Sequence, residues 1–263
     1  PKRSLLRVTI SDAMSMEYFF VDDTNGTGTH YSYGSTHIKS MLDGAKKYIE
    51  KLDKLWPTER LATVTEASLM GMRVHKNDWI YVALMKNRHL VEGKKVAVVG
   101  SSEPRIETIA AAFGASTIHT IEYNKLTYGD GKVIPVRTFS ASEFEHFYET
   151  SEASFDVVIS ISSIEHDGLG RYGDPLSPNA DLEAMKKVMG ILKPGGVFFL
   201  SVPIGPDVTV FNLHRRYGQL RLPLLLDGWE VLDKIPWNEQ RLFKEANWRQ
   251  TYEPIFVLAK ESN

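Results

Sequence analysis

The sequence comprises 263 residues, of which 43% are hydrophobic and 24% are charged, and its formal net charge is −2. A chain of this length suits one large α/β domain with an extension, and its near-neutral charge excludes a broad basic surface for nucleic acid or an anionic membrane. The sequence has no cysteine, which excludes disulfides, thiolate nucleophiles and cysteine-ligated metals, and no apolar run is long enough to span a membrane.

The first 92 residues predict a helical segment behind a polar start. Residues 1–36 include the glycine- and tyrosine-bearing string DDTNGTGTHYSYGS, which fits either a flexible terminus or a lid over a pocket. Apolar residues then recur at helical spacing until Trp56-Pro57 ends the pattern. We predict helices at 36–55, 65–72 and 77–86.

From residue 93 the pattern changes to alternating strands and helices. Short β-branched runs bounded by glycine and polar residues predict strands, and Pro104 fits the first turn of the helix that follows the first strand. The prediction is a strand at 96–99, a helix ending at 113, a strand at 116–121, a long loop at 123–131, a strand within 132–139 and a helix at 143–150.

The clearest unit is FDVVISISSIEHDGLGRYGDPL, followed by ILKPGGVFFLSVP. The β-branched run 155–161 predicts a strand buried on both faces, and a helix at 181–192 ends at the KPGG turn, before a strand at 197–202. These elements form one βαβ unit. After Pro203 we expect a polar loop, a helix at 219–226 and strands at 229–232 and 254–259.

Two of these strings resemble a known class of enzymes. FDVVISISSIEH and LKPGG resemble the second half of class I S-adenosylmethionine-dependent methyltransferases, and this likeness covers about residues 90–260. The longer SSIEHDGLGRYGDPL, with VAVVGSSEPRIE and TIEYNKL, is similar more narrowly to a family of uncharacterised methyltransferase-like proteins that is named for its unknown function. The narrower likeness brings no substrate with it.

The resemblance implies a fold and a division of the chain. The implied fold is a Rossmann-like α/β domain: a seven-stranded, mostly parallel sheet with helices on both faces and an antiparallel last strand. We expect this domain at 93–263, after a helical N-terminal cap at 1–92. Because such enzymes often carry their substrate cap at the N-terminus, the lid interpretation of the first residues is slightly favoured.

Two residues at the ends of predicted strands point to a nucleotide-like ligand. Gly100 leaves room for a ligand, and Glu122 lies where an acid accepts ribose hydroxyls; a turn glycine and a solvated carboxylate are the alternatives. The resemblance implies S-adenosylmethionine as cofactor, although serines replace the usual further glycines. We expect cofactor contacts from Gly100, Ser101, Ser102, Glu122, Tyr123, Ser140 and Ser162.

The loop after strand 155–161 carries the candidate catalytic residues. Methyl transfer to oxygen or nitrogen requires removal of a proton, and His166 is the first candidate because histidine titrates near neutrality. Glu165 and Asp174 are the other candidates, and a structural role for His166 is the alternative. The acids of this loop fit no known ligand spacing, so we predict no metal site.

A basic string at 214–216 is the candidate acceptor-binding segment. His214, Arg215 and Arg216 follow the fifth strand, and arginine pairs bind carboxylates or phosphates in bidentate fashion. A charged helix start paired with acids is the alternative.

The sequence therefore predicts an S-adenosylmethionine-dependent methyltransferase that acts on a small polar acceptor, with anionic or sugar-like compounds among the candidates and oxygen as the favoured methyl acceptor. The alternative is a catalytically inactive binding or scaffold protein that has lost its cofactor. A nicotinamide-dependent oxidoreductase is less favoured, because G-x-G-x-x-G is absent. We expect no nucleic-acid partner and no membrane insertion of this segment, slightly favour the cytoplasm, and leave the oligomeric state open.

Overall fold

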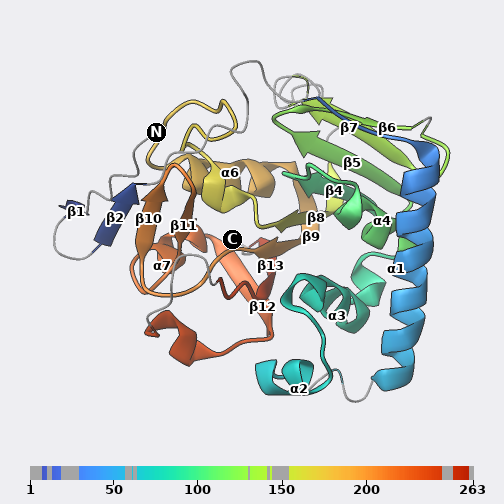
Figure 1. Cartoon of the computed structure of the whole chain (residues 1–263), viewed down its shortest axis with the longest axis horizontal. Helices are drawn as coiled ribbons and strands as arrows, with labels where there is room; N and C mark the ends of the chain where they lie inside the picture. The colour runs from blue at the N-terminus through green and yellow to red at the C-terminus, as the bar shows by residue number, and fades with distance from the viewer. Residues whose placement is uncertain are drawn as a thin grey trace.

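The computed structural model describes residues 8–10, 14–18, 30–56, 61, 64–129, 131–140, 143, 154–244 and 251–260. Its centre is a seven-stranded sheet in the order β12-β13-β9-β8-β4-β5-β7 (Figure 1). β13 runs antiparallel to both neighbours, and the other strands run parallel to one another. The strands are β4 (Lys95–Val99), β5 (Thr117–Glu122), β7 (Val136–Ser140), β8 (Phe155–Ile161), β9 (Leu192–Ser201), β12 (Trp229–Ile235) and β13 (Ile255–Lys260). This arrangement confirms the predicted fold class and the antiparallel last strand.

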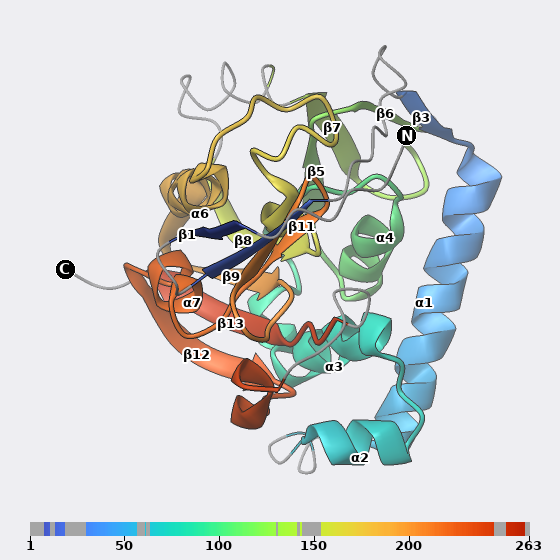
Figure 2. The same cartoon turned by 60° about the vertical axis from the view of Figure 1, so that its left-hand side comes forward.

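Helices cover both faces of the sheet. Figure 2 shows α3 and α4 on one side, with α1 outside them, and α6 on the other side. The helices are α1 (Ser35–Leu55), α2 (Glu66–Gly71), α3 (Trp79–Lys86), α4 (Arg105–Ala112), α6 (Ala180–Ile191) and α7 (Arg221–Leu225). Each lies within or next to a predicted helix, so the helical periodicity of the sequence located them correctly.

The core explains why these segments form buried elements. Val157, Val158 and Ile159 of β8 have no exposed surface, which confirms the prediction of a strand buried on both faces. The short helix α3 is buried over all residues from Trp79 to Met85, and it contacts α1 as well as β12 and β13. Burial of each large apolar side chain contributes about 1.5–3 kcal/mol. One hydrophobic core therefore contains residues from before and after residue 93, and the division of the chain there stays a prediction.

A second sheet lies beside the central one, and the sequence did not predict it. Its order is β1-β2-β10-β11, and its strands are β1 (Val8–Ile10), β2 (Met14–Tyr18), β10 (Val208–Phe211) and β11 (His214–Arg216). β2 pairs in parallel with β10. The prediction of a polar loop after Pro203 is therefore wrong at two segments, because β10 pairs with β2 from the start of the chain and β11 pairs with β10.

Two other boundaries also differ. β6 (Lys125–Tyr128) lies within the loop expected at 123–131, and it pairs in parallel with β3 (His30–Tyr33). β9 begins at Leu192 rather than after the KPGG turn, because Leu192 pairs with Phe155 and a register shift accommodates the turn. The helix expected at 143–150 lies outside the described residues except for Glu143, as does most of the segment 1–36.

Candidate functional site

The candidate site lies at the carboxyl edge of the central sheet. The chain proceeds from β4 to β5 and β7 in one direction, and from β8 to β9 in the other. The loops after β4 and β8 therefore separate at this point, and open α/β sheets bind ligands in such a crevice. Gly100 begins the first of these loops and Ser162 the second.

Position 100 requires glycine because of its backbone conformation and because of the neighbouring Ser163. Its φ is +73°, and a Cβ at this position would lie 1.6 Å from Oγ and 2.4 Å from Cβ of Ser163. Non-glycine residues rarely adopt this conformation. We had interpreted the missing side chain as room for a ligand, whereas in the structure the Ser163 side chain occupies that room.

Gly100→Ala is therefore expected to destabilise the protein by about 2–4 kcal/mol, through backbone strain and overlap with Ser163. Urea unfolding measures this loss. In a double-mutant cycle, Gly100→Ala should cost only about 1 kcal/mol when Ser163 is glycine, because the overlap is removed and the backbone strain remains. If Gly100→Ala lowers the free energy of unfolding equally in both backgrounds, the contact with Ser163 has no energetic role.

The two serines after Gly100 make hydrogen bonds inside the protein. Ser101 is buried, and its Oγ lies 2.7 Å from the carbonyl oxygen of Glu103 and 3.0 Å from Oε2 of Glu107. The carbonyl oxygen of Ser102 accepts a hydrogen bond from the hydroxyl of Tyr33 at 2.7 Å. The Ser101 hydroxyl thus points into the protein, and the backbone of the loop remains for a ligand.

Glu122 ends β5 at the same edge. Its Oε1 accepts the backbone N–H of Asn124 at 3.2 Å, and burial raises the pKa of the carboxyl. Glu122 pairs with Ser140, the last residue of β7, and Tyr123 is exposed beside it. The structure therefore brings these strand ends together as predicted, although the side chain of Ser140 is not described.

Glu165 lies buried in the η4 turn (Ile164–His166) that follows β8. It is 1% exposed, and its Oε1 accepts a hydrogen bond from the Ser162 hydroxyl at 2.8 Å. Within the described part of the chain, Oε2 has no hydrogen-bond partner. Burial, with the charge of Glu253 adding to it, raises the pKa of Glu165 well above its usual value. Burial therefore favours the protonated form of this carboxyl.

Burial has the opposite effect on the pKa of His166 and keeps this side chain neutral at pH 7. Burial lowers its pKa to about 4, and its Nδ1 contacts the carbonyl oxygen of Leu213. The hydrogen is assigned to Nδ1 from this contact, which leaves the lone pair on Nε2. Nε2 lies 3.6 Å from Oε1 of Glu165. Since His166 is neutral at pH 7, this contact is not an ion pair.

The two aspartates of the loop differ in role. Asp174 accepts the backbone N–H groups of Gly170 at 3.1 Å and Tyr172 at 3.2 Å, so it fixes the loop. Asp167 is partly exposed, and burial followed by the charge of Asp174 raises its pKa to about 7. The charge of Glu122 also contributes to this rise.

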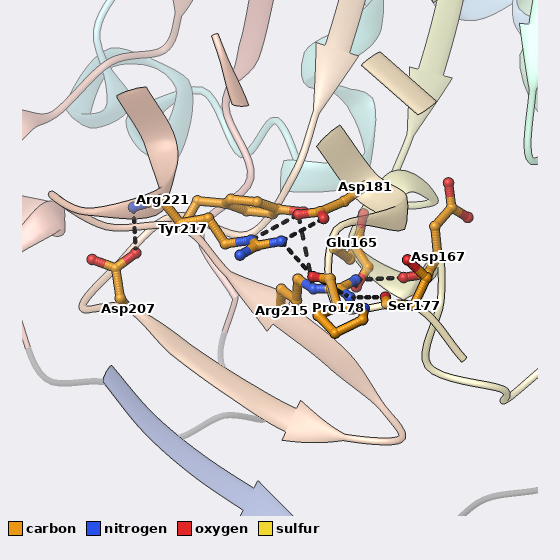
Figure 3. Close-up of polar contacts among 9 residues, drawn as sticks. All are labelled: Glu165, Asp167, Ser177, Pro178, Asp181, Asp207, Arg215, Tyr217 and Arg221. Atoms are coloured by element: carbon orange, nitrogen blue, oxygen red, sulfur yellow. Dashed lines mark hydrogen bonds and ion pairs between the residues drawn. The ribbon is translucent and has the colours of Figure 1, made fainter. Parts of the chain in front are cut away.

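Arg215 lies inside the protein, where its guanidinium binds backbone carbonyls (Figure 3). It is 2% exposed. Nη1 donates to the carbonyl oxygens of Asp167 at 2.5 Å and Glu165 at 3.4 Å, and Nη2 donates to those of Ser177 at 3.2 Å and Pro178 at 3.4 Å. This single side chain therefore connects both ends of the candidate catalytic loop.

A buried aspartate completes this network. Asp181, in the first turn of α6, has no exposed surface and accepts hydrogen bonds from Nε and Nη2 of Arg221 at 2.8 and 2.6 Å (Figure 3). The Tyr217 hydroxyl donates to it at 2.9 Å, and Nε of Arg215 lies 3.8 Å away. Such a fully paired carboxylate fixes α6 against β11 and α7.

The other two residues of the basic string also make internal contacts. Arg216 donates from Nε to the carbonyl oxygen of Pro206 at 2.8 Å. His214 is buried, its pKa is lowered to about 4 by burial, and its ring centroid lies 6.3 Å from that of His166. The structure thus brings His214 to the candidate catalytic loop and directs Arg215 into the interior.

The sequence did not predict that Glu107 and Asp181 are buried and bonded inside the protein. Glu107 offered a weak signal, since it interrupts the apolar face of the helix RIETIAAA. Asp181 offered none, because acidic residues are common in the first turn of a helix. Among the described residues, no three histidine, aspartate or glutamate side chains are grouped to hold a metal ion. The two main cavities, of about 460 and 680 Å³, lie near Trp237 and near His119, away from this edge.

With the geometry in place, comparisons with known proteins become informative. A family model described as "Caenorhabditis protein of unknown function, DUF268" matches residues 93–254. The chain belongs to this family. The DUF268 match contains all the candidate site residues, while α1, α2 and α3 precede it. A comparison with curated proteins gives no significant match.

Solved structures similar to this DUF268 chain include a ribosomal protein L11 methylase from Lactobacillus delbrueckii subsp. bulgaricus (11% identity, TM-score 0.39, 67% of this chain and 74% of that one). TehB from Haemophilus influenzae has 10% identity and a TM-score of 0.44, over 68% of this chain and 62% of that one. A SAM-dependent methyltransferase from Leishmania major has 13% identity and a TM-score of 0.44, over 83% of each chain. Likenesses at this level identify neither cofactor nor acceptor. No helix in the described part of the chain is long and apolar enough to cross a membrane.

Proposed function

We propose that this DUF268 protein is an S-adenosylmethionine-dependent methyltransferase that acts on a small, neutral, polar acceptor, at oxygen. The observation that supports it best is the position of Glu122: a carboxylate at the end of β5, next to the point where the strand order reverses at β4. An acid at this position can accept both hydroxyls of a ribose.

The residues of the edge fit such a cofactor. Glu122 accepts hydrogen bonds from its neighbours Tyr123 and Asn124, and a carboxylate has about four lone-pair sites, so it can accept from a diol as well. No described residue accepts a hydrogen bond from the backbone N–H groups of Ser101, Ser102 and Glu103, which precede α4 and suit a carboxylate. When bound, the cofactor would supply an activated methyl group, and the protein would orient the acceptor and accept its proton.

The proton-accepting group in this proposal is Asp167 rather than His166. A general base is most effective when its pKa lies near the working pH. The pKa of Asp167 is about 7, whereas that of His166 is about 4. His166, which is neutral at pH 7, and Glu165 then position the acceptor through hydrogen bonds.

The arginines support a neutral acceptor. Arg215 binds backbone carbonyl oxygens inside the protein, and the partly exposed Arg216 donates from Nε to the carbonyl oxygen of Pro206. His166 and His214 are neutral at pH 7, and burial favours the protonated form of Glu165. Arg171, the remaining arginine of the loop, lies over the ring of Tyr172. These contacts favour a hydroxyl compound without net charge over an anionic acceptor.

A second candidate is a protein of the same fold that no longer binds cofactor. The observation that favours it is the loop after β4: the Ser163 side chain takes the room at Gly100, and the Ser101 hydroxyl is bound internally. Cofactor binding distinguishes the two candidates directly.

Calorimetry with S-adenosylmethionine and S-adenosylhomocysteine tests this proposal, with NADH as a control ligand. We expect micromolar binding of both sulfur compounds and none of NADH. Glu122→Ala should weaken binding at least about tenfold, because hydrogen bonds to a charged group contribute about 1.5–3 kcal/mol.

The matched control is Glu230→Ala, which removes an exposed carboxylate of β12 at the far edge of the sheet and should leave binding unchanged. Circular dichroism verifies that each variant is folded. If the folded parent protein binds neither sulfur compound, the methyltransferase proposal is wrong and the second candidate takes its place.

A further inference from the structure

A fully buried acid lies directly behind the proposed cofactor loop. Glu107, in the first turn of α4, has no exposed surface. Its Oε1 lies 2.8 Å from the hydroxyl of Thr120 on β5 and 3.2 Å from that of Tyr128 on β6, and its Oε2 lies 3.0 Å from the hydroxyl of Ser101. The carboxyl thus links α4, two strands and the loop.

The hydrogens of this cluster can be counted. Ser101 has one hydroxyl hydrogen but two acceptors within reach, the carbonyl oxygen of Glu103 at 2.7 Å and Oε2 of Glu107 at 3.0 Å. If Glu107 carries a proton, its O–H donates to Ser101, and Ser101 donates to Glu103. Every polar atom in this series of hydrogen bonds then has a partner.

Ionisation of Glu107 would interrupt this series of hydrogen bonds. The carboxylate would attract the Ser101 hydrogen, since hydrogen bonds to charged groups are stronger, and the carbonyl of Glu103 would lose its hydroxyl donor. The loop that begins α4 would then be held by one hydrogen bond fewer.

Among the described residues, the groups that act on the Glu107 carboxyl are the hydroxyls of Thr120, Ser101 and Tyr128 and the backbone N–H of Glu107, and no cation is among them. The nearby titratable groups are Tyr33 and Glu103. Burial raises the pKa of Glu107 to about 7, against the effect of the three hydroxyls. The two states of the cluster therefore exchange close to neutral pH.

We propose that Glu107 is a positioning residue for the cofactor: in its neutral form it holds Ser101 and the Glu103 carbonyl in the conformation that binds the methionine end. This inference rests on the proposed cofactor binding. Affinity for the cofactor should therefore decrease as the pH rises through neutrality, although Glu107 does not contact the ligand.

The first test measures the Kd of S-adenosylhomocysteine at pH 6 and pH 8.5 for the parent protein, Glu107→Gln and an exposed control, Glu183→Gln. Glutamine reproduces the neutral acid at both pH values, because its amide donates and accepts. From pH 6 to pH 8.5 we expect affinity to fall about tenfold more in the parent and the control than in Glu107→Gln, for the loss of about one hydrogen bond. Titration of the ligand itself affects all three proteins equally. The same pH dependence in all three would overturn the inference.

The second test needs no ligand. Hydrogen exchange of the hydrogen-bonded amides of Gly100 and Arg105, at the two ends of this loop, corrected for the intrinsic effect of pH, should show about tenfold greater protection at pH 6 than at pH 8.5 in the parent, and no such difference in Glu107→Gln. Ser101→Ala, which removes the link, should also abolish the difference, and it serves if Glu107→Gln does not fold. Absence of ligand binding at both pH values would contradict the proposed function alone. Equal protection at both pH values in the parent would contradict the role of Glu107.

Discussion

Replacement of Arg215 by methionine is expected to lower the free energy of unfolding by about 3–5 kcal/mol, measured by urea unfolding. Methionine fills a similar volume but leaves the carbonyl oxygens of four residues without this donor. It also removes one of the two cations near the buried Asp181, which keeps its bonds to Arg221.

The matched control for this prediction is Arg216→Met on the same strand. Arg216 is partly exposed and donates from Nε to one carbonyl oxygen, so its replacement should cost no more than about 1 kcal/mol. Hydrogen exchange should locate the Arg215 effect at 163–178, the loop whose carbonyls it binds. Similar losses for the two arginines would contradict the role assigned to the buried guanidinium.

Replacement of Glu107 by glutamine is expected to make the protein more stable than the parent at pH 8, but not at low pH. Burial raises the pKa of Glu107 from 4.5 to about 7. Between these values the native state keeps a proton that the unfolded chain releases, so the stability of the parent falls as the pH rises. The full shift corresponds to about 3 kcal/mol.

Urea unfolding at pH 5 and pH 8 measures this effect as a difference between the two proteins. The advantage of Glu107→Gln should grow by about 2–3 kcal/mol over this interval. Asp167 and the buried histidines also titrate, but they do so in both proteins and cancel. If the difference between the proteins does not change with pH, Glu107 is ionised in the native state throughout this range.

The positions of the main elements follow from local sequence patterns. The run 155–161 contains consecutive β-branched residues, and such a run is buried on both faces of a parallel sheet. The helical periodicity of 36–55 produced α1, and the strand ends at Gly100 and Glu122 meet at one edge as expected. The carboxyl ends of parallel strands lie together by geometry, so this edge could be predicted without the tertiary structure.

The second sheet could not be predicted in this way. β10 and β6 are short and partly polar, and they pair with β2 and β3 from the N-terminal part of the chain. Local residues do not specify such partners. The loops expected at these places became strands because distant backbone groups were available to satisfy their hydrogen bonds.

The sequence alone thus determined the α/β fold class, the edge of the sheet at which the candidate site lies and the acidic strand end at Glu122. The tertiary structure decided which polar groups face that site. Arg215 suggested an anion-binding residue, yet its guanidinium binds internal carbonyls, and Glu107 resembled an ordinary helix acid, yet it is fully buried behind the loop. Burial and hydrogen-bond partners depend on elements far apart in the chain, and they determine both the protonation state of a side chain and its availability to a ligand.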